Sequence, residues 1–421
     1  MKKTIASIVM SILSCLLLFA NGVKDTGSGK LVFWDKSEYV AAYNKASQAR
    51  FEQFGKEHNI EIEYVIVPPN DLKQKLLAAI EAGNPPDLVV TDDFLGKQFA
   101  GMGQLVDIAD INSAINFTKA GRDVAYVSNG NYVIPLALLA PGFYIRSDKW
   151  EEKGLKLPTT WQELYETAKI VNDPAHDFYA LGYPMGDSGG GDAEGMCRAV
   201  ILAFGGIPVD KNGRVTVNSK ETLEALKFIA KLYKEKLCPP SAITWDDMGN
   251  NTAFMAGSVG VIQNAASVFS QLKRENPSLY SKTKIMNYPS GPAGSFTLGG
   301  GNVICIFKRG KNTAAAKEYV KYFFDKKFYS DLLIQMGGMW QPTIDGVTDN
   351  EFWKRPENAG WLASSQNVVP NTYPAPATDL TTKAFSMQLC VKSVQKIVLK
   401  NTDPQQALNE LEADLKRVLG Q

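Results

Sequence analysis

Short apolar runs of strand length alternate with helical periods along this chain, and that order restricts the folds open to it. Residues 31–34 and 60–67 are rich in apolar, aromatic and β-branched side chains, and a helical period over residues 39–58 separates them. Strands that alternate with helices in this way form α/β folds, in which most strands of a sheet run parallel. We therefore predict an α/β fold with a largely parallel sheet.

The alternation continues to the end of the chain, whose 421 residues are enough for two or three domains. Thr160 and Glu163 have the spacing of a capping box, which predicts a helix that runs through Val171. Asp403 precedes Pro404 at the start of the last predicted helix. The other expected elements are helices at 70–83 and 222–237 and strands at 88–90, 259–262 and 303–307.

The composition excludes two broad classes of protein. Lys and Arg together number 45 and Asp and Glu number 44, so the chain lacks the basic excess that is typical of nucleic-acid binding. Hydrophobic residues make up 45% and charged residues 21%, which is typical of a globular protein and not of a multi-span membrane protein. We expect no nucleic-acid partner.

The N-terminal segment has the features of an export signal. Two lysines precede an apolar run over residues 5–19, which is too short to cross a bilayer comfortably. We predict a signal peptide over residues 1–22 and a mature protein that is periplasmic or otherwise extracytoplasmic. Cys15 follows residues 12–14 in a loose lipobox, so a lipid anchor at Cys15 stays open, as does an uncleaved membrane anchor.

Four further cysteines lie in the predicted mature chain. An oxidising compartment permits disulfides among them, in three different pairings, but a chain of this length can be stable without covalent links. No two of them are spaced like metal ligands, and no motif indicates a cofactor. We expect buried free thiols, no metal and no cofactor. The four are Cys197, Cys238, Cys305 and Cys390.

Some motifs with catalytic associations lack the partners that catalysis needs. Residues 186–190 match the loop around the nucleophile of trypsin-like serine proteases, but that chemistry needs a histidine base, and the two histidines are expected on a helix and in a loop. The glycines at 299–301 lack the Lys and Ser or Thr of a phosphate-binding loop. Acidic pairs at 92–93 and 246–247 would suit a glycosidase or a metal ion, although adjacent acids in loops usually point apart. We predict no catalytic residue.

Tryptophans occur at three predicted strand ends or loops, with acidic or amide side chains nearby. Open α/β sheets bind ligands beyond the carboxyl ends of their strands. An indole ring covers the apolar face of a sugar while polar side chains bind its hydroxyls. This grouping favours a carbohydrate pocket. The tryptophans are Trp34, Trp245 and Trp340, and the polar residues are Asp35, Asp93, Asp247 and Gln341.

The order of several short segments resembles the family 1 extracellular solute-binding proteins, which are substrate receptors of sugar-importing ABC transporters. The most specific match is residues 154–164, Gly-Leu-Lys-Leu-Pro-Thr-Thr-Trp-Gln-Glu-Leu. Residues 254–264 resemble a second segment of the family. Weaker matches extend the resemblance to nearly the whole mature chain, and they lie at 31–34, 84–90, 131–135, 143–148, 299–300, 313–325 and 337–342.

The resemblance implies a type II periplasmic-binding-protein fold, with two α/β lobes and a ligand cleft between them. It implies a first lobe over residues 30–135 and 295–339 and a second lobe over residues 136–294 and 340–421. The implied function is a receptor that captures a mono- or oligosaccharide, closes by a hinge and delivers the ligand to ABC permease subunits without chemical change. The chain itself is expected to be a monomer that meets the membrane only through the permease or a lipid anchor.

The resemblance also implies sugar contacts, each carried over to the residue at the matching place in this sequence. Asn264 departs from the common pattern, because Ala265 follows it where many members have Gly or Pro. The implied contacts are Trp34, Asp35, Asp92 or Asp93, Tyr144, Trp245, Asn264, Gly300 and Trp340, and we add Asp247 beside Trp245.

Other ligands and another class of function stay open at this stage. Asp35, Asp93 and Asp247 would suit a polyamine, whereas an anion would find only Arg146 and Arg198. A metal ion is a third alternative ligand. An exported glycan hydrolase with paired acids is the alternative from a different class of protein.

Overall fold

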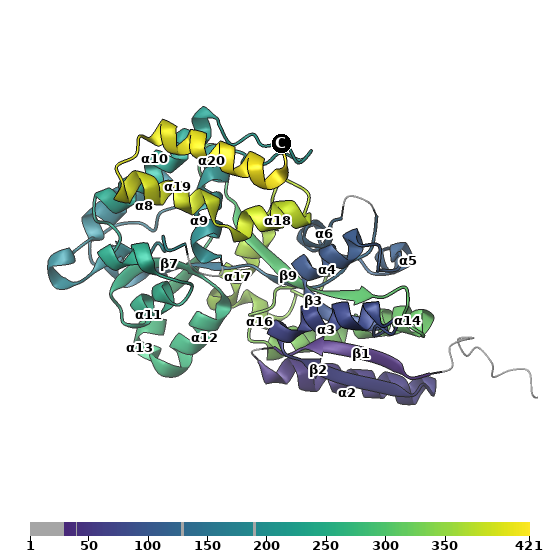
Figure 1. The fold of residues 1–421 in the computed structure, drawn as a ribbon. Coiled ribbons are helices and arrows are strands. Elements are labelled where there is room, and N and C mark those ends of the chain that lie inside the picture. The colour runs from purple at the N-terminus through teal and green to yellow at the C-terminus, as the bar shows by residue number, and fades with distance from the viewer. Residues whose placement is uncertain (1–28, 39, 128–129, 188–190) are drawn as a thin grey trace, which may run out of the picture.

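The computed structural model describes residues 29–421 except 39, 128–129 and 188–190, so the predicted signal segment and Cys15 lie outside it. Two β-sheets form, and helices cover both faces of each (Figure 1). The first sheet consists of β1 (Leu31–Lys36), β2 (Ile62–Val67), β3 (Leu88–Asp92), β4 (Ile134–Leu139), β9 (Thr297–Ile306) and β10 (Val368–Pro370). The second consists of β5 (Gly142–Arg146), β6 (Tyr179–Leu181), β7 (Val259–Asn264) and β8 (Thr283–Met286).

Each sheet and the helices packed on it form a lobe, and we call these the first and second lobes. The first lobe has α2 (Ala41–His58), α3 (Pro69–Glu81), α4 (Asp93–Gly101), α5 (Ala109–Ala114), α6 (Lys119–Ala125), α14 (Thr313–Phe323), α15 (Lys326–Gln335) and α16 (Glu351–Lys354). The second has α7 (Ser147–Glu151), α8 (Trp161–Val171), α9 (Asp192–Phe204), α10 (Lys220–Lys234), α11 (Gly249–Met255), α12 (Ala266–Glu275), α13 (Pro277–Ser281), α17 (Pro356–Gln366), α18 (Asp379–Ser386), α19 (Leu389–Leu399) and α20 (Pro404–Leu419). Short 3-10 turns lie at Pro174–His176 and Pro240–Thr244.

Alternation of side chains along β9 explains why the first lobe has a core on each face of its sheet. Val303 and Cys305 pack with α3 and α4 on one face. Ile304 and Ile306 pack on the other face with α2, α14 and α15. Successive side chains of a strand point to opposite faces, so a strand with both faces covered is apolar throughout. The uninterrupted apolar run that predicted this strand has this physical cause.

The α/β class is confirmed, but the expectation of largely parallel pairing is wrong for the second sheet. Its strand order is β6-β7-β5-β8, and β5 pairs antiparallel with both neighbours. In the first sheet β1 pairs parallel with β2 and β3, whereas β9 is antiparallel to β3 and β4. A parallel pair needs a long crossover connection within one sheet. β9 enters the first sheet from the second lobe, so no connection within the first sheet sets its direction. It can therefore pair antiparallel with its neighbours.

The chain crosses between the lobes more than once, and the crossings differ from the boundaries expected from sequence. β4 pairs with β9 as far as Leu139, so the expected boundary after residue 135 falls inside a strand of the first sheet. Gln341 joins this strand, because its N–H donates to the Leu138 carbonyl (3.0 Å) and its Oε1 accepts from Ala140 N–H (2.9 Å). The chain stays in the first lobe through α16, so the expected boundary at residue 340 is also displaced, and β10 returns to the first sheet after α17. The chain ends in the second lobe, where the C-terminal helices α19 and α20 pack near α9 and α10 (Figure 1).

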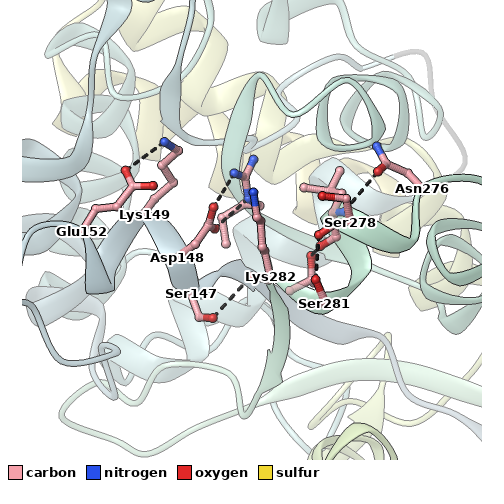
Figure 2. Close-up of polar contacts among 11 residues, drawn as sticks. Ser147, Asp148, Lys149, Glu152, Asn276, Ser278, Ser281 and Lys282 are labelled. Atoms are coloured by element: carbon pink, nitrogen blue, oxygen red, sulfur yellow. Dashed lines mark hydrogen bonds and ion pairs between the residues drawn. The ribbon is translucent and has the colours of Figure 1, made fainter.

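Polar contacts around α7 hold an edge of the second lobe (Figure 2). Ser147 begins α7 directly after β5, and its backbone N–H donates to the Lys282 carbonyl at 2.9 Å. Asp148 accepts two hydrogen bonds from Arg146, at 2.8 and 2.7 Å, in a bidentate pair. The hydrogen bond from Ser147 to Lys282 continues the antiparallel pairing of β5 and β8, while the Arg146–Asp148 pair holds the junction of β5 and α7.

The four cysteines of the described chain test the expectation of buried free thiols. Cys197, Cys238, Cys305 and Cys390 are buried and free, which confirms the prediction of unpaired thiols. Burial raises the pKa of each thiol, so these side chains stay protonated and apolar.

None of the helices over the described ranges combines the length and apolar character of a membrane span.

Candidate ligand-binding site

A cavity of about 310 Å³ lies where the two lobes face each other. The first lobe contributes the end of β4 and the start of β9, with Leu139 and Gly300 among the lining residues. The second lobe contributes Asp192 at the start of α9, Gln263 on β7 and Phe385 on α18. Because both lobes supply lining residues, a ligand in this cavity would contact both of them.

Two carboxylates lie together on the second-lobe side of the cavity. Oδ1 of Asp247 accepts the backbone N–H groups of Gly191 at 3.2 Å and Asp192 at 3.1 Å, at the first turn of α9. A carboxylate at this position satisfies free N–H groups and interacts favourably with the helix dipole. Burial, followed by the charge of Asp247, raises the pKa of Asp192 to about 7. The cleft therefore holds a carboxyl group that is easily protonated near neutral pH.

Asparagine side chains fix the position of Asp192. Its Oδ2 accepts from Nδ2 of Asn250 at 3.3 Å and from Nδ2 of Asn264 at 3.4 Å. Asn250 also donates to the Gln263 carbonyl at 3.1 Å, which links α11 to β7. Asn264 is 5% exposed, so its effect on the cleft is indirect: it holds the carboxylate of Asp192 in position.

The aromatic ring that lines the cavity belongs to Phe385. It is 7% exposed, and the guanidinium carbon of Arg198 lies 5.2 Å from its ring centroid. Nε of Arg198 donates to Oε1 of Glu194 at 2.7 Å, and Oε2 of Glu194 accepts the Val391 N–H at 3.0 Å. This buried ion pair ties α9 to α19 and packs against the ring from the protein side.

Gly300 also lines the cavity, and Asp93 lies beside it. A Cβ at Gly300 would clash with Oδ1 of Asp93, so glycine lets β9 pass close to this carboxylate. Asp93 accepts the Gly301 N–H at 3.1 Å and pairs with Lys97 at 2.8 Å, and it is buried. Asp92 is exposed and caps α4 by accepting the Leu95 N–H at 2.8 Å. The two adjacent acids therefore have separate structural partners.

Asp35 lies inside the first lobe and away from the cavity lining. Its carboxylate accepts hydrogen bonds from the hydroxyls of Tyr64 at 2.6 Å, Ser47 at 2.8 Å and Tyr43 at 3.2 Å. Burial raises its pKa to about 7, although the three hydroxyls counteract the shift. The unfolded chain leaves the same group near its ordinary value of about 4.

We expect Asp35→Asn to reduce the pH dependence of stability. Between pH 4 and pH 7 the folded protein holds a proton on Asp35 that the unfolded chain has released, so the wild type loses stability as pH rises. The loss from this group is on the order of 4 kcal/mol. Urea unfolding across this pH range measures the effect. The free energy of unfolding of the variant should rise relative to that of the wild type as pH rises. Asp71→Asn, at an exposed position, is the matched control, and parallel curves for all three proteins would contradict the assignment.

The aromatic residues proposed from sequence lie outside the described cavity lining. Trp340 is 1% exposed in the first-lobe core, with its ring centroid 4.4 Å from that of Tyr43. Trp34 packs against the core that α3 and α4 share, and Trp245 packs between the two cores of the second lobe. Tyr144 is fully buried and donates its hydroxyl to the Ala265 carbonyl at 2.6 Å. Of the proposed contacts, Asp247 and Gly300 are the two that line the cavity.

Sequence reasoning missed Asp192, Gln263 and Phe385. A usable signal existed for Asp192, because it follows three consecutive glycines in the sequence and begins a helix. Gln263 lies beside Asn264 in a segment that the family resemblance had already singled out. Nothing local distinguishes Phe385 from a core phenylalanine, since its place at the cleft depends on how α18 packs against the second lobe.

Two α/β lobes with a cleft between them define the class of two-lobed substrate-binding proteins. The chain belongs to the bacterial extracellular solute-binding proteins, whose family model matches residues 38–328. This match confirms the family resemblance and the type II fold expected from it. The members are binding proteins, in agreement with the expectation that the chain is not an enzyme. In the described residues, no group of three or more His, Cys, Asp or Glu side chains is arranged to hold a metal ion.

Relatives and solved structures agree with this membership. A probable ABC transporter-binding protein of Deinococcus radiodurans is 24% identical over 348 residues, which cover 79% of each chain. A maltotriose-binding protein of Pyrococcus abyssi is 25% identical over 248 residues, or 57% of this chain and 50% of that one. The fold matches an ABC transporter solute-binding protein of Thermotoga lettingae bound with α-D-tagatose, with a TM-score of 0.73 at 20% identity over 93% of this chain and 100% of that one.

Proposed function

We propose that this protein captures a mono- or oligosaccharide in the interlobe cleft and delivers it to the permease subunits of an ABC importer. The observation that carries the proposal is the cavity itself, which combines carboxylates, an amide and an aromatic ring with backbone from both lobes. Aromatic faces cover the C–H surfaces of a sugar, while carboxylate and amide groups bind its hydroxyls. The maltotriose- and tagatose-binding relatives support the same ligand class.

Closure of the lobes follows from the position of the ligand. A molecule that touches Gly300 on the first lobe and Asp192 on the second makes more contacts when the lobes approach each other. Because its affinity is higher for the closed form, it shifts the population toward that form. The connections at residues 140–141, between β4 and β5, and at 287–296, between β8 and β9, are the segments about which we propose that the lobes move.

The proposed place of action is outside the cytoplasm, as in the extracellular family to which the chain belongs. Export by residues 1–22 and lipid attachment at Cys15 stay predictions from the sequence, as does the monomeric state. The permease is the proposed partner because a relative is described as an ABC transporter-binding protein.

Isothermal titration calorimetry against a panel of mono- and oligosaccharides tests the ligand class. We expect at least one sugar to bind, and Phe385→Leu to weaken that binding by about tenfold, because loss of a ring contact costs about 1.4 kcal/mol. Leucine keeps most of the apolar packing against Arg198. Leu380→Ala on the same helix is the control, since Leu380 is 47% exposed.

Two outcomes would contradict the proposal in different ways. Turnover of an oligosaccharide would indicate a hydrolase instead of a receptor. Equal affinities for the wild type and Phe385→Leu would show that the ligand does not contact the ring, even where a sugar binds.

A further inference from the structure

The second-lobe wall of the cleft carries negative charge without a positive side chain beside it. Asp192 and Asp247 both line the cavity, and none of the described lining residues is Lys or Arg. Arg198, on α9, lies outside the cavity lining, is 4% exposed and is paired with Glu194. The two carboxylates therefore face the cavity without neutralisation by the protein residues that line it.

Much of the hydrogen-bonding capacity of these carboxylates is unused by the described residues. Asp247 accepts two backbone N–H groups through Oδ1, and none of the described groups donates to its Oδ2. Asp192 accepts two long amide hydrogen bonds through Oδ2, and none of the described groups donates to its Oδ1. Each carboxylate thus keeps an oxygen available to a donor from the ligand.

Gln263 provides a second and independent observation. Its side chain lines the same cavity from β7, is 5% exposed, and its Oε1 is buried without a hydrogen-bond partner. A buried acceptor without a partner costs free energy, which a donor supplied by a ligand recovers. Gly195, on the facing turn of α9, has no side chain to fill the space near this amide.

We propose that the ligand is a sugar that carries a protonated amino group, and that this ammonium group binds between Asp192 and Asp247 with Gln263 beside it. The inference rests on the proposed function and names the substrate class of the same site. A hydroxyl donates one hydrogen bond and offsets no charge, whereas an ammonium group has three donors, no acceptor and a positive charge. Two carboxylates and the unpaired oxygen of Gln263 match the second set of properties.

The repulsion between the two carboxylates agrees with this assignment. Burial and the neighbouring Asp247 raise the pKa of Asp192, so the two negative charges are costly together when no cation is present. An ammonium group between them supplies the missing opposite charge. The Arg198–Glu194 pair packs against Phe385 and is neutral overall. It therefore supplies neither a cation for the two aspartates nor a third negative charge for the ligand.

Calorimetry with the full protein distinguishes the ammonium from the rest of the sugar. We compare glucosamine, glucose and N-acetylglucosamine, the disaccharide forms of each, and spermidine, at neutral pH. The amino sugar should bind about tenfold or more tightly than the matching neutral sugar, which corresponds to about 1.4 kcal/mol. Asp192→Asn and Asp247→Asn should each remove that preference while binding of the neutral sugar persists. Asp246→Asn, at the exposed neighbouring position, should keep it.

The remaining outcomes separate this inference from the proposed function. Equal or tighter binding of the neutral and N-acetylated sugars would overturn the ammonium site and leave the sugar receptor standing. Binding of spermidine without binding of any sugar would overturn both, and so would a panel in which no sugar binds. Loss of the amino-sugar preference in Asp246→Asn would also contradict the assignment, because that side chain is outside the site.

Discussion

Trp340→Ala is expected to lower the free energy of unfolding by about 3–5 kcal/mol, which is typical of deleting a large core side chain. The ring is 1% exposed and packs against Tyr43 among the apolar side chains of the first lobe. Its removal leaves a cavity that the surrounding helices fill only in part. Ligand affinity, measured well below the unfolding temperature, should stay close to that of the wild type because the ring does not line the cleft.

The control for this variant is Tyr126→Ala, another aromatic truncation on the same lobe. Tyr126 is 62% exposed, so its loss should change the free energy of unfolding by less than about 0.5 kcal/mol. Chemical denaturation of both variants gives the comparison. A Trp340→Ala protein of normal stability that had lost its ligand affinity would show that the ring stacks on the ligand, as the sequence alone had indicated.

Glu194→Ala is expected to cost about 3–5 kcal/mol, because it leaves the charge of Arg198 buried without its partner. The two side chains are 0% and 4% exposed, and Nη2 of Arg198 already lacks a hydrogen-bond partner among the described residues. The substitution also deprives the Val391 N–H of its acceptor. Equilibrium unfolding in urea measures the loss.

A double variant tests whether the uncompensated charge causes this loss. Glu194→Leu combined with Arg198→Met replaces the pair with apolar side chains, and most of the stability should return, since buried pairs and apolar replacements are often similar in free energy. The unpaired Val391 N–H should keep part of the cost, about 1–3 kcal/mol. If the losses of the single variants Glu194→Leu and Arg198→Met added up in the double variant, the two side chains would not be a coupled pair.

Local elements followed directly from the sequence. The capping box predicted at Thr160 forms with both of its hydrogen bonds, and Asp403 caps the last helix by accepting two N–H groups. The strand expected at 88–90 is observed as Leu88–Asp92, and the helix expected at 222–237 as Lys220–Lys234. Caps, turns and periodicity depend on residues within a few positions of one another, so a sequence window contains the whole interaction.

The residues that line the cavity could not be predicted in the same way. Trp34 and Asp35 are adjacent at the end of β1, yet each packs with a different part of the first lobe: Trp34 contacts the core shared with α3 and α4, and Asp35 bonds to Tyr43 on α2. Neighbours on a strand point to opposite faces. Polar and aromatic residues side by side in sequence therefore did not form one pocket.

By itself, the sequence determined the α/β class, the family and most of the helices and strands, because periodicity, caps and short segments are written in consecutive residues. Only the tertiary structure decided which side chains meet at the cleft. Asp192, Asp247, Gln263 and Phe385 come from distant segments, and they meet because α9, β7 and α18 pack together in the second lobe. Trp340 is buried against Tyr43, which is far away in the sequence, and Asp35 is buried against Tyr64 on the neighbouring strand, since burial depends on packing between elements that no local pattern records.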